Sequence, residues 1–93
     1  MLEVNNNDRF KLKNSVSIRN ILGETFFMLD SETGKQYNLS EMEYEIIEMI
    51  SKGMSFSETV ENITLNYNAP KEQIKNDLKE YFISLVEEGL ILT

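Results

Sequence analysis

The feature that most constrains the fold is the stretch FFMLDSETGKQYNLSEMEYEII at residues 26–47. It begins as a strand, passes through a glycine-containing turn and continues as a short strand in which Tyr37 and Leu39 share one face. Ser40 and Glu43 then form an S-x-x-E capping box, the usual start of a helix. A hairpin that enters a helix without a spacer indicates a small α+β domain.

Similar signals divide the chain into three strands and three helices. Alternating apolar residues predict strands at residues 16–23, 24–30 and 35–39. The helices are predicted to begin at Ser40, at Ser55, which starts a second capping box, and at Pro70, which suits a first helical turn. We therefore predict a winged-helix-like α+β fold, with a three-stranded antiparallel sheet followed by three helices.

The domain is predicted to be a single unit over residues 15–93, because 93 residues suffice for one modest core. Residues 1–14 are polar, rich in asparagine and without hydrophobic periodicity. They are therefore predicted to form a flexible lead-in.

Composition argues against an enzyme or a metalloprotein. The chain has no Cys and no His, so it lacks thiolate and imidazole ligands, a cysteine nucleophile and a histidine base. Its four glycines are explained by turns and caps and form no phosphate-binding motif. No segment approaches the run of about 18 apolar residues that a membrane span needs. We expect a non-catalytic, cytoplasmic protein with no metal and no cofactor.

The charge is concentrated in the second half of the chain. Residues 1–39 hold five basic and five acidic residues, whereas residues 40–93 hold four basic and eleven acidic ones. A helix-turn-helix interpretation remains an alternative, since the third helix offers Lys71, Gln73 and Lys75 to DNA. The same helix is also acidic, and an acidic surface repels phosphate backbones. A winged-helix DNA-binding regulator is therefore the second hypothesis.

Short motifs follow one another in a characteristic order along the chain. The hairpin carries Leu29-Asp30, Thr33-Gly34 and Tyr37-Asn38-Leu39-Ser40, and the last helix carries Asp77-Leu78, Phe82, Leu85 and Gly89-Leu90-Ile91. These motifs and their order resemble the hairpin and the closing motif of the PqqD-like family of precursor-peptide recognition proteins. Ser40 stands where the family usually has Asn, and both residues are good N-caps.

The resemblance implies that the leader segment of a ribosomally made precursor peptide adds as a strand beside the third strand, in a cleft walled by the third helix. An open strand edge provides such binding, and neighbouring side-chain pockets provide specificity. The expected peptide-binding residues are Lys35, Gln36, Tyr37, Asn38 and Leu39 on the strand, and Ile74, Asp77, Leu78, Tyr81 and Leu85 on the helix.

The resemblance also implies enzyme partners that modify the bound peptide. A leader peptidase and a cyclase are the partners expected of a stand-alone recognition protein in a lasso-peptide pathway. A radical S-adenosylmethionine enzyme is the alternative, as in the biosynthesis of a quinone cofactor. No nucleic acid and no membrane are expected among the partners.

Overall fold

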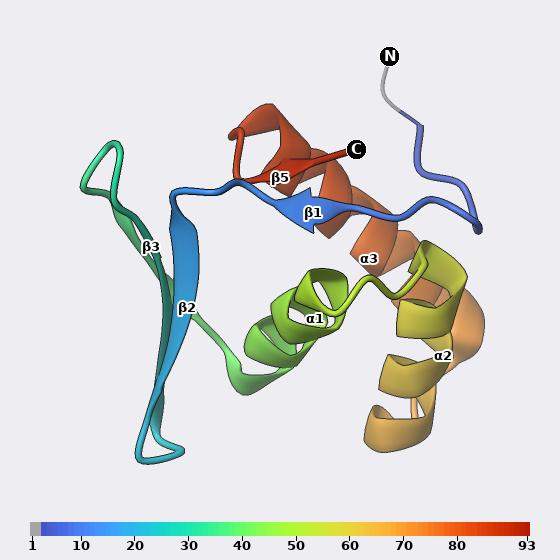
Figure 1. Ribbon diagram of the computed structural model, residues 1–93. Helices are drawn as coiled ribbons and strands as arrows, with labels where there is room; N and C mark the ends of the chain where they lie inside the picture. Colours follow the sequence, from blue (N-terminus) through green and yellow to red (C-terminus); the bar gives the residue numbers. More distant parts are fainter. Residues whose placement is uncertain (1–2) are drawn as a thin grey trace.

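The computed structural model describes residues 3–93, which form a small sheet packed beside three helices (Figure 1). The strands are β1 Lys11–Leu12, β2 Val16–Ile21, β3 Thr25–Asp30, β4 Gln36–Leu39 and β5 Ile91–Leu92. The helices are α1 Glu41–Ser51, α2 Phe56–Tyr67 and α3 Lys71–Glu87. The predicted α+β fold, with a three-stranded antiparallel sheet followed by three helices, is confirmed.

The main sheet has the strand order β2-β3-β4, and both of its strand pairs are antiparallel. Leu22 and Gly23 both have positive φ and turn the chain from β2 to β3. Between β3 and β4, Gly34 also has positive φ, and its N–H donates to the carbonyl of Asp30 at 2.8 Å. Glycine adopts this conformation without steric cost, so this hairpin turn is well suited to its sequence.

Both predicted capping boxes are present. Ser40 Oγ accepts from the N–H of Glu43 at 3.1 Å, and Glu43 Oε1 accepts from the N–H of Ser40 at 2.8 Å. Ser55 and Glu58 make the equivalent pair of hydrogen bonds at the start of α2. Pro70 differs from the prediction: it is the N-cap of α3, and the helix begins at Lys71.

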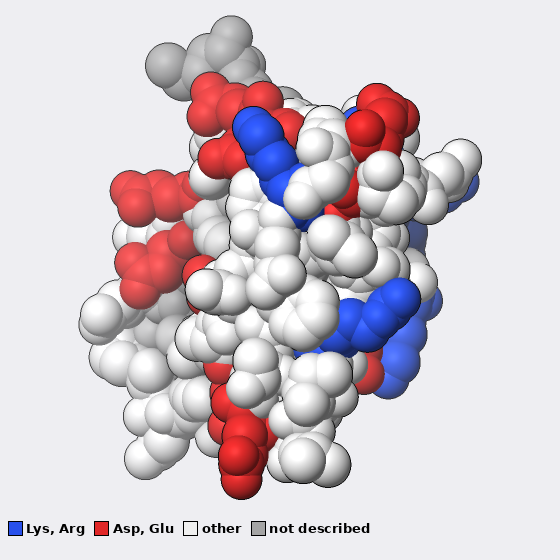
Figure 2. Space-filling model, turned by 90° about the vertical axis from the view of Figure 1, so that its left-hand side faces the viewer, with Lys and Arg blue, Asp and Glu red and all other residues white. Residues whose placement is uncertain are grey.

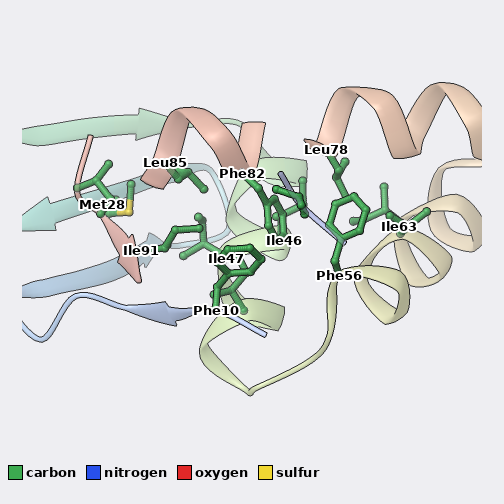
Figure 3. Packing of buried hydrophobic residues seen from close by; sticks show 14 of the residues in the cluster. Phe10, Met28, Ile46, Ile47, Phe56, Ile63, Leu78, Phe82, Leu85 and Ile91 are labelled. Carbon is green, nitrogen blue, oxygen red and sulfur yellow. The ribbon is translucent and has the colours of Figure 1, made fainter. Parts of the chain in front are cut away.

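The core lies between the three helices and is built around three phenylalanines (Figure 3). The ring of Phe82 on α3 meets Phe10 and Phe56 edge-on, with ring centroids 5.2 Å apart in each pair. Ile47 on α1 and Met28 on β3 are also buried, so the inward face of the sheet joins the same core. Edge-on aromatic pairs of this kind add to the stabilisation that burial provides.

The prediction of a flexible lead-in over residues 1–14 is wrong for residues 3–14. Val4 and Phe10 are buried, and β1 pairs with β5 through Lys11 opposite Leu92 and Leu12 opposite Ile91. The segment also contacts α2, because the N–H of Phe56 donates to the carbonyl of Asp8 at 2.8 Å. The physical reason is that a few apolar side chains and backbone hydrogen bonds fix a segment that has no periodicity.

Within the part of the chain that the structure describes, no helix combines the length and the apolar character that crossing a membrane requires.

Candidate functional site

The strand β4 is an open edge of the sheet, since β3 is its one partner in the ladder. The N–H of Asp30 donates to the carbonyl of Lys35 at 3.0 Å, which makes these two residues a hydrogen-bonded pair. Because such pairs alternate with non-hydrogen-bonded ones, Tyr37 and Leu39 use their backbone groups toward β3. The N–H and C=O groups of Gln36 and Asn38 therefore point to the open side.

The opposite edge of the same sheet is less accessible to an added strand. On β2, the guanidinium of Arg19 turns back along the strand and donates to the carbonyl of Ile18 at 3.0 Å. By the same alternation Ile18 faces away from β3, so this contact occupies an acceptor on the β2 edge. Charged side chains on an edge strand discourage pairing, so β4 is the edge better suited to strand addition.

A pocket of about 130 Å³ lies beside the open edge. We call it the β4 pocket; its lining residues are Met28, Tyr37, Asn38, Leu39, Glu43, Tyr81, Ser84, Leu85, Glu88 and Leu90. They come from β3, β4, the first turn of α1, the second half of α3 and the residues that follow it. The pocket is apolar at its base, because Met28, Leu85 and Leu90 are buried.

The electrostatics of the β4 pocket are negative. Two of its lining residues, Glu43 and Glu88, are acidic, and none of those within residues 3–93 is Lys or Arg. Burial raises the pKa of the Tyr81 phenol above its usual value, and the nearby Glu43 carboxylate raises it further. Tyr81 is therefore neutral at physiological pH and available to donate a hydrogen bond from its hydroxyl.

Five of the ten predicted site residues come together in the β4 pocket: Tyr37, Asn38, Leu39, Tyr81 and Leu85. Lys35, which precedes β4, and Gln36, its first residue, are exposed. Asp77 is exposed on α3, one turn before Tyr81 and outside the lining. Ile74 and Leu78 lie elsewhere. They are 6% and 3% exposed and pack within the core, outside the pocket.

Sequence reasoning missed the other five lining residues, Met28, Glu43, Ser84, Glu88 and Leu90. Ser84 and Glu88 follow Tyr81 at i+3 and i+7, so helical spacing from Tyr81 was a usable signal. Glu43 carries an obvious capping signal, but a residue in the first turn after β4 also lies close to the strand. Met28 and Leu90 had no local signal, because cross-strand and tertiary packing bring them there.

The sheet face turned away from the helices is the side of the molecule seen in Figure 2. Its centre is largely uncharged, and acidic side chains gather at the left border, the top and the lower end of this view. Among residues 3–93, no group of three or more His, Cys, Asp or Glu side chains is placed to hold a metal ion. The chemistry that this site offers is backbone hydrogen bonding together with apolar and acidic side-chain contact.

Three solved structures share the fold. TbiB1 in complex with the TbiA(beta) leader peptide has a TM-score of 0.79 at 21% identity, over 87% of this chain and 93% of that one. A lasso peptide synthetase B1 complexed with its leader peptide has a TM-score of 0.81 at 21% identity, over 92% of this chain and 100% of that one.

The third is the PqqD part of PqqCD from Methylobacterium extorquens, described as a stand-alone recognition element for ribosomally synthesised and modified peptides. Its TM-score is 0.78 at 14% identity, over 97% of this chain and 95% of that one. At these identities the similarity establishes the fold. No curated protein matches the sequence significantly.

The sequence itself matches a family over its central and C-terminal parts. The matched family is described as coenzyme PQQ synthesis protein D, and the match runs over residues 25–91. It includes β3, β4, all three helices and the start of β5, and therefore every residue that lines the β4 pocket. The chain belongs to the PqqD family.

Proposed function

We propose that this protein is a non-catalytic recognition element that binds the leader segment of a ribosomally made precursor peptide and presents it to modifying enzymes. The observation that carries the proposal is the open edge of β4 beside an apolar pocket. An extended peptide gains affinity from hydrogen bonds to such an edge and specificity from side-chain pockets beside it. Membership of the PqqD family and the leader-bound state of two proteins of the same fold support the proposal.

The direction of the backbone groups specifies how the leader is held. Gln36 and Asn38 each offer an outward N–H and C=O, and their N–H groups meet no protein acceptor within residues 3–93. A leader strand paired with them places alternate side chains on the inward side of the sheet, next to Tyr37 and Leu39. Those side chains enter the β4 pocket, and the intervening ones lie on the outer face.

The proposal includes the partners and the setting. One protein of the same fold is described as a lasso peptide synthetase B1 complexed with the leader peptide, which favours a leader peptidase and a cyclase as partners. A radical S-adenosylmethionine enzyme is the alternative that we propose, since the family is described by the synthesis of the coenzyme PQQ. We place the protein in the cytoplasm, where precursor peptides are synthesised.

Amide hydrogen exchange, measured residue by residue with and without a peptide selected for binding from a random 12-residue library, tests the proposal. The N–H groups of Gln36 and Asn38 should gain protection when the peptide binds, because they acquire acceptors. Those of Tyr37 and Leu39 serve as internal controls, since the sheet already protects them. Binding that leaves the Gln36 and Asn38 amides unprotected excludes strand addition at β4.

The comparisons give no support to DNA binding, the second hypothesis from the sequence. Titration of labelled duplex DNA at physiological salt should show at most weak binding that is independent of sequence. Tight, sequence-dependent DNA binding would overturn the proposed function.

A further inference from the structure

The β4 pocket has an acidic residue whose charge has no structural role in the fold. Among residues 3–93, its lining includes two acidic residues, Glu43 and Glu88, and no Lys or Arg. Glu43 has a structural task, because its carboxylate accepts from the N–H of Ser40 at 2.8 Å and completes a capping box. Glu88 has none: among residues 3–93 its carboxylate makes no hydrogen bond and no ion pair.

Glu88 also stands where helix electrostatics disfavour a carboxylate. It is the C-cap of α3, it follows Glu87, and the last turn of the helix contains no basic residue. The C-terminus of a helix carries the negative end of the macrodipole, so acidic side chains there are destabilising. A sequence that departs from such a local preference commonly does so at a functional site.

The remaining walls suit the stem of a long basic side chain. Tyr37 and Tyr81 are half-buried, so part of each aromatic ring remains accessible from the pocket. Lys and Arg pack their methylene stems along apolar surface and keep the charged group at a polar rim. Their charged groups are also attracted to aromatic faces.

We propose that the β4 pocket is a specificity subsite for a Lys or Arg side chain of the bound peptide, with Glu88 and Glu43 as its charged partners. The inference rests on the proposed function, because the added strand delivers the side chain. The cationic residue occupies an inward position of that strand, with apolar residues two positions away on either side. Its neighbours in sequence lie on the outer face and contribute little selectivity.

The test begins with a peptide library, so that the protein itself selects the sequences that it binds. Phage-displayed random peptides of 12 residues are selected on the wild-type protein and sequenced. We expect one position to be enriched in Lys or Arg, with apolar residues two positions away. The best peptide is then synthesised with Lys and with norleucine at that position, which keeps the stem and removes the charge.

Titrations with both peptides against three variants separate charge from packing. Glu88→Gln and Glu43→Gln remove the proposed partners, and Gln also serves in a capping box, so the start of α1 is retained. Each variant should weaken the Lys peptide by about five- to tenfold and leave the norleucine peptide unchanged. Glu87→Gln is the matched control, an exposed neighbour outside the pocket lining that should change neither affinity.

The outcomes distinguish this inference from the proposed function. Peptides that protect the Gln36 and Asn38 amides without an enriched cation overturn the subsite and leave strand addition standing. The subsite is also overturned if the Glu88→Gln and Glu43→Gln variants keep the wild-type ratio of the affinity for the Lys peptide to the affinity for the norleucine peptide. A library that yields no binder overturns the proposed function and the subsite together.

Discussion

Tyr37 lies directly opposite Met28 in the β3–β4 ladder, and its backbone groups are used within the sheet. Its neighbour Asn38 lies opposite Phe27 and directs the corresponding groups outward. Proline removes one N–H, so Asn38→Pro should leave the fold nearly intact and abolish leader binding. Tyr37→Pro should instead break a ladder hydrogen bond and disrupt the hairpin. Thermal melts and leader titrations on the same samples measure both effects.

Alanine variants are the controls for this pair, because proline also replaces the side chain. Asn38→Ala should retain most of the binding that Asn38→Pro loses, and Tyr37→Ala should melt above Tyr37→Pro. Gln36→Pro should behave like Asn38→Pro, since both residues face the open side. A folded Asn38→Pro variant that binds like wild type would show that the peptide does not use this edge.

The hairpin between β2 and β3 contains a strained residue. Leu22 has φ of 56° and is 91% exposed, so it occupies a left-handed conformation without a compensating contact. The conformation costs a non-glycine residue roughly 1–2 kcal/mol, and Asn tolerates it better. Leu22→Asn creates the Asn-Gly pair preferred in such hairpins and should raise the free energy of unfolding by about 0.5–1 kcal/mol. Denaturant titration measures this gain in stability. Leu22→Ala keeps the backbone strain and should therefore raise the free energy of unfolding only slightly.

Asp30 links stability to pH. The Ser15 hydroxyl donates to the Asp30 carboxylate at 2.7 Å. This hydrogen bond is the main cause that lowers the pKa of Asp30 below its ordinary value of 3.8. The N–H of Glu32 and the ammonium of Lys13 act in the same direction, against the effect of burial. A carboxyl group with a lowered folded pKa stabilises the protein above its unfolded pKa, and this stability is lost as the pH falls through the folded value.

Asp30→Asn should therefore melt below wild type at pH 7, and the difference should shrink once the pH falls below about 4. Thermal melts between pH 7 and pH 2 give the comparison. Glu24→Gln, at an exposed hairpin position, is the control and should follow the wild-type curve. A constant difference between Asp30→Asn and wild type at every pH would assign the effect to shape rather than charge.

Phe10 tests whether the N-terminal segment belongs to the fold. It is 2% exposed and its ring meets Phe82 edge-on, so Phe10→Ala should lower the free energy of unfolding by about 3–5 kcal/mol. Leu65→Ala is the comparison, because the Leu65 side chain is apolar and 81% exposed. It should change the free energy of unfolding by less than about 0.5 kcal/mol. Chemical denaturation measures both variants, and a small effect of Phe10→Ala would restore the prediction of a flexible lead-in.

The sequence predicted the elements whose signals are local. The capping boxes of Ser40 and Ser55 and the glycine after α3 specify helix ends through neighbouring residues alone, so pattern reasoning located them. The pairing of β1 with β5 accompanies the burial of Phe10 and Ile91 in the same core. Two-residue strands carry no detectable period, and for that reason the second sheet was missed.

The candidate site was predictable in part for the same reason. The family resemblance pointed to the third strand and the third helix as the site. Alternation along β4 then placed Tyr37 and Leu39 on one face, and spacing along α3 placed Tyr81 and Leu85 together. Ile74 and Leu78 share the apolar spacing of Leu85, but α3 turns that end of its stripe toward the core. The helical period of a sequence shows which residues lie on the same face of a helix. What each turn of that face packs against is set by the tertiary structure.

The β1–β5 ladder joins the first strand of the chain to the last. Closing so long a loop costs entropy before the pairing returns any energy, so this contact belongs to the late steps of folding. During synthesis, the hairpins and the first two helices leave the ribosome before Ile91, and Phe10 must wait for its buried surroundings. Leu12→Ala and Ile91→Val should accordingly speed unfolding and leave the folding rate almost unchanged. Their kinetic φ-values, the ratios of the change in folding barrier to the change in stability, should therefore lie near zero. A nascent chain therefore completes this core only after Ile91 has left the ribosome.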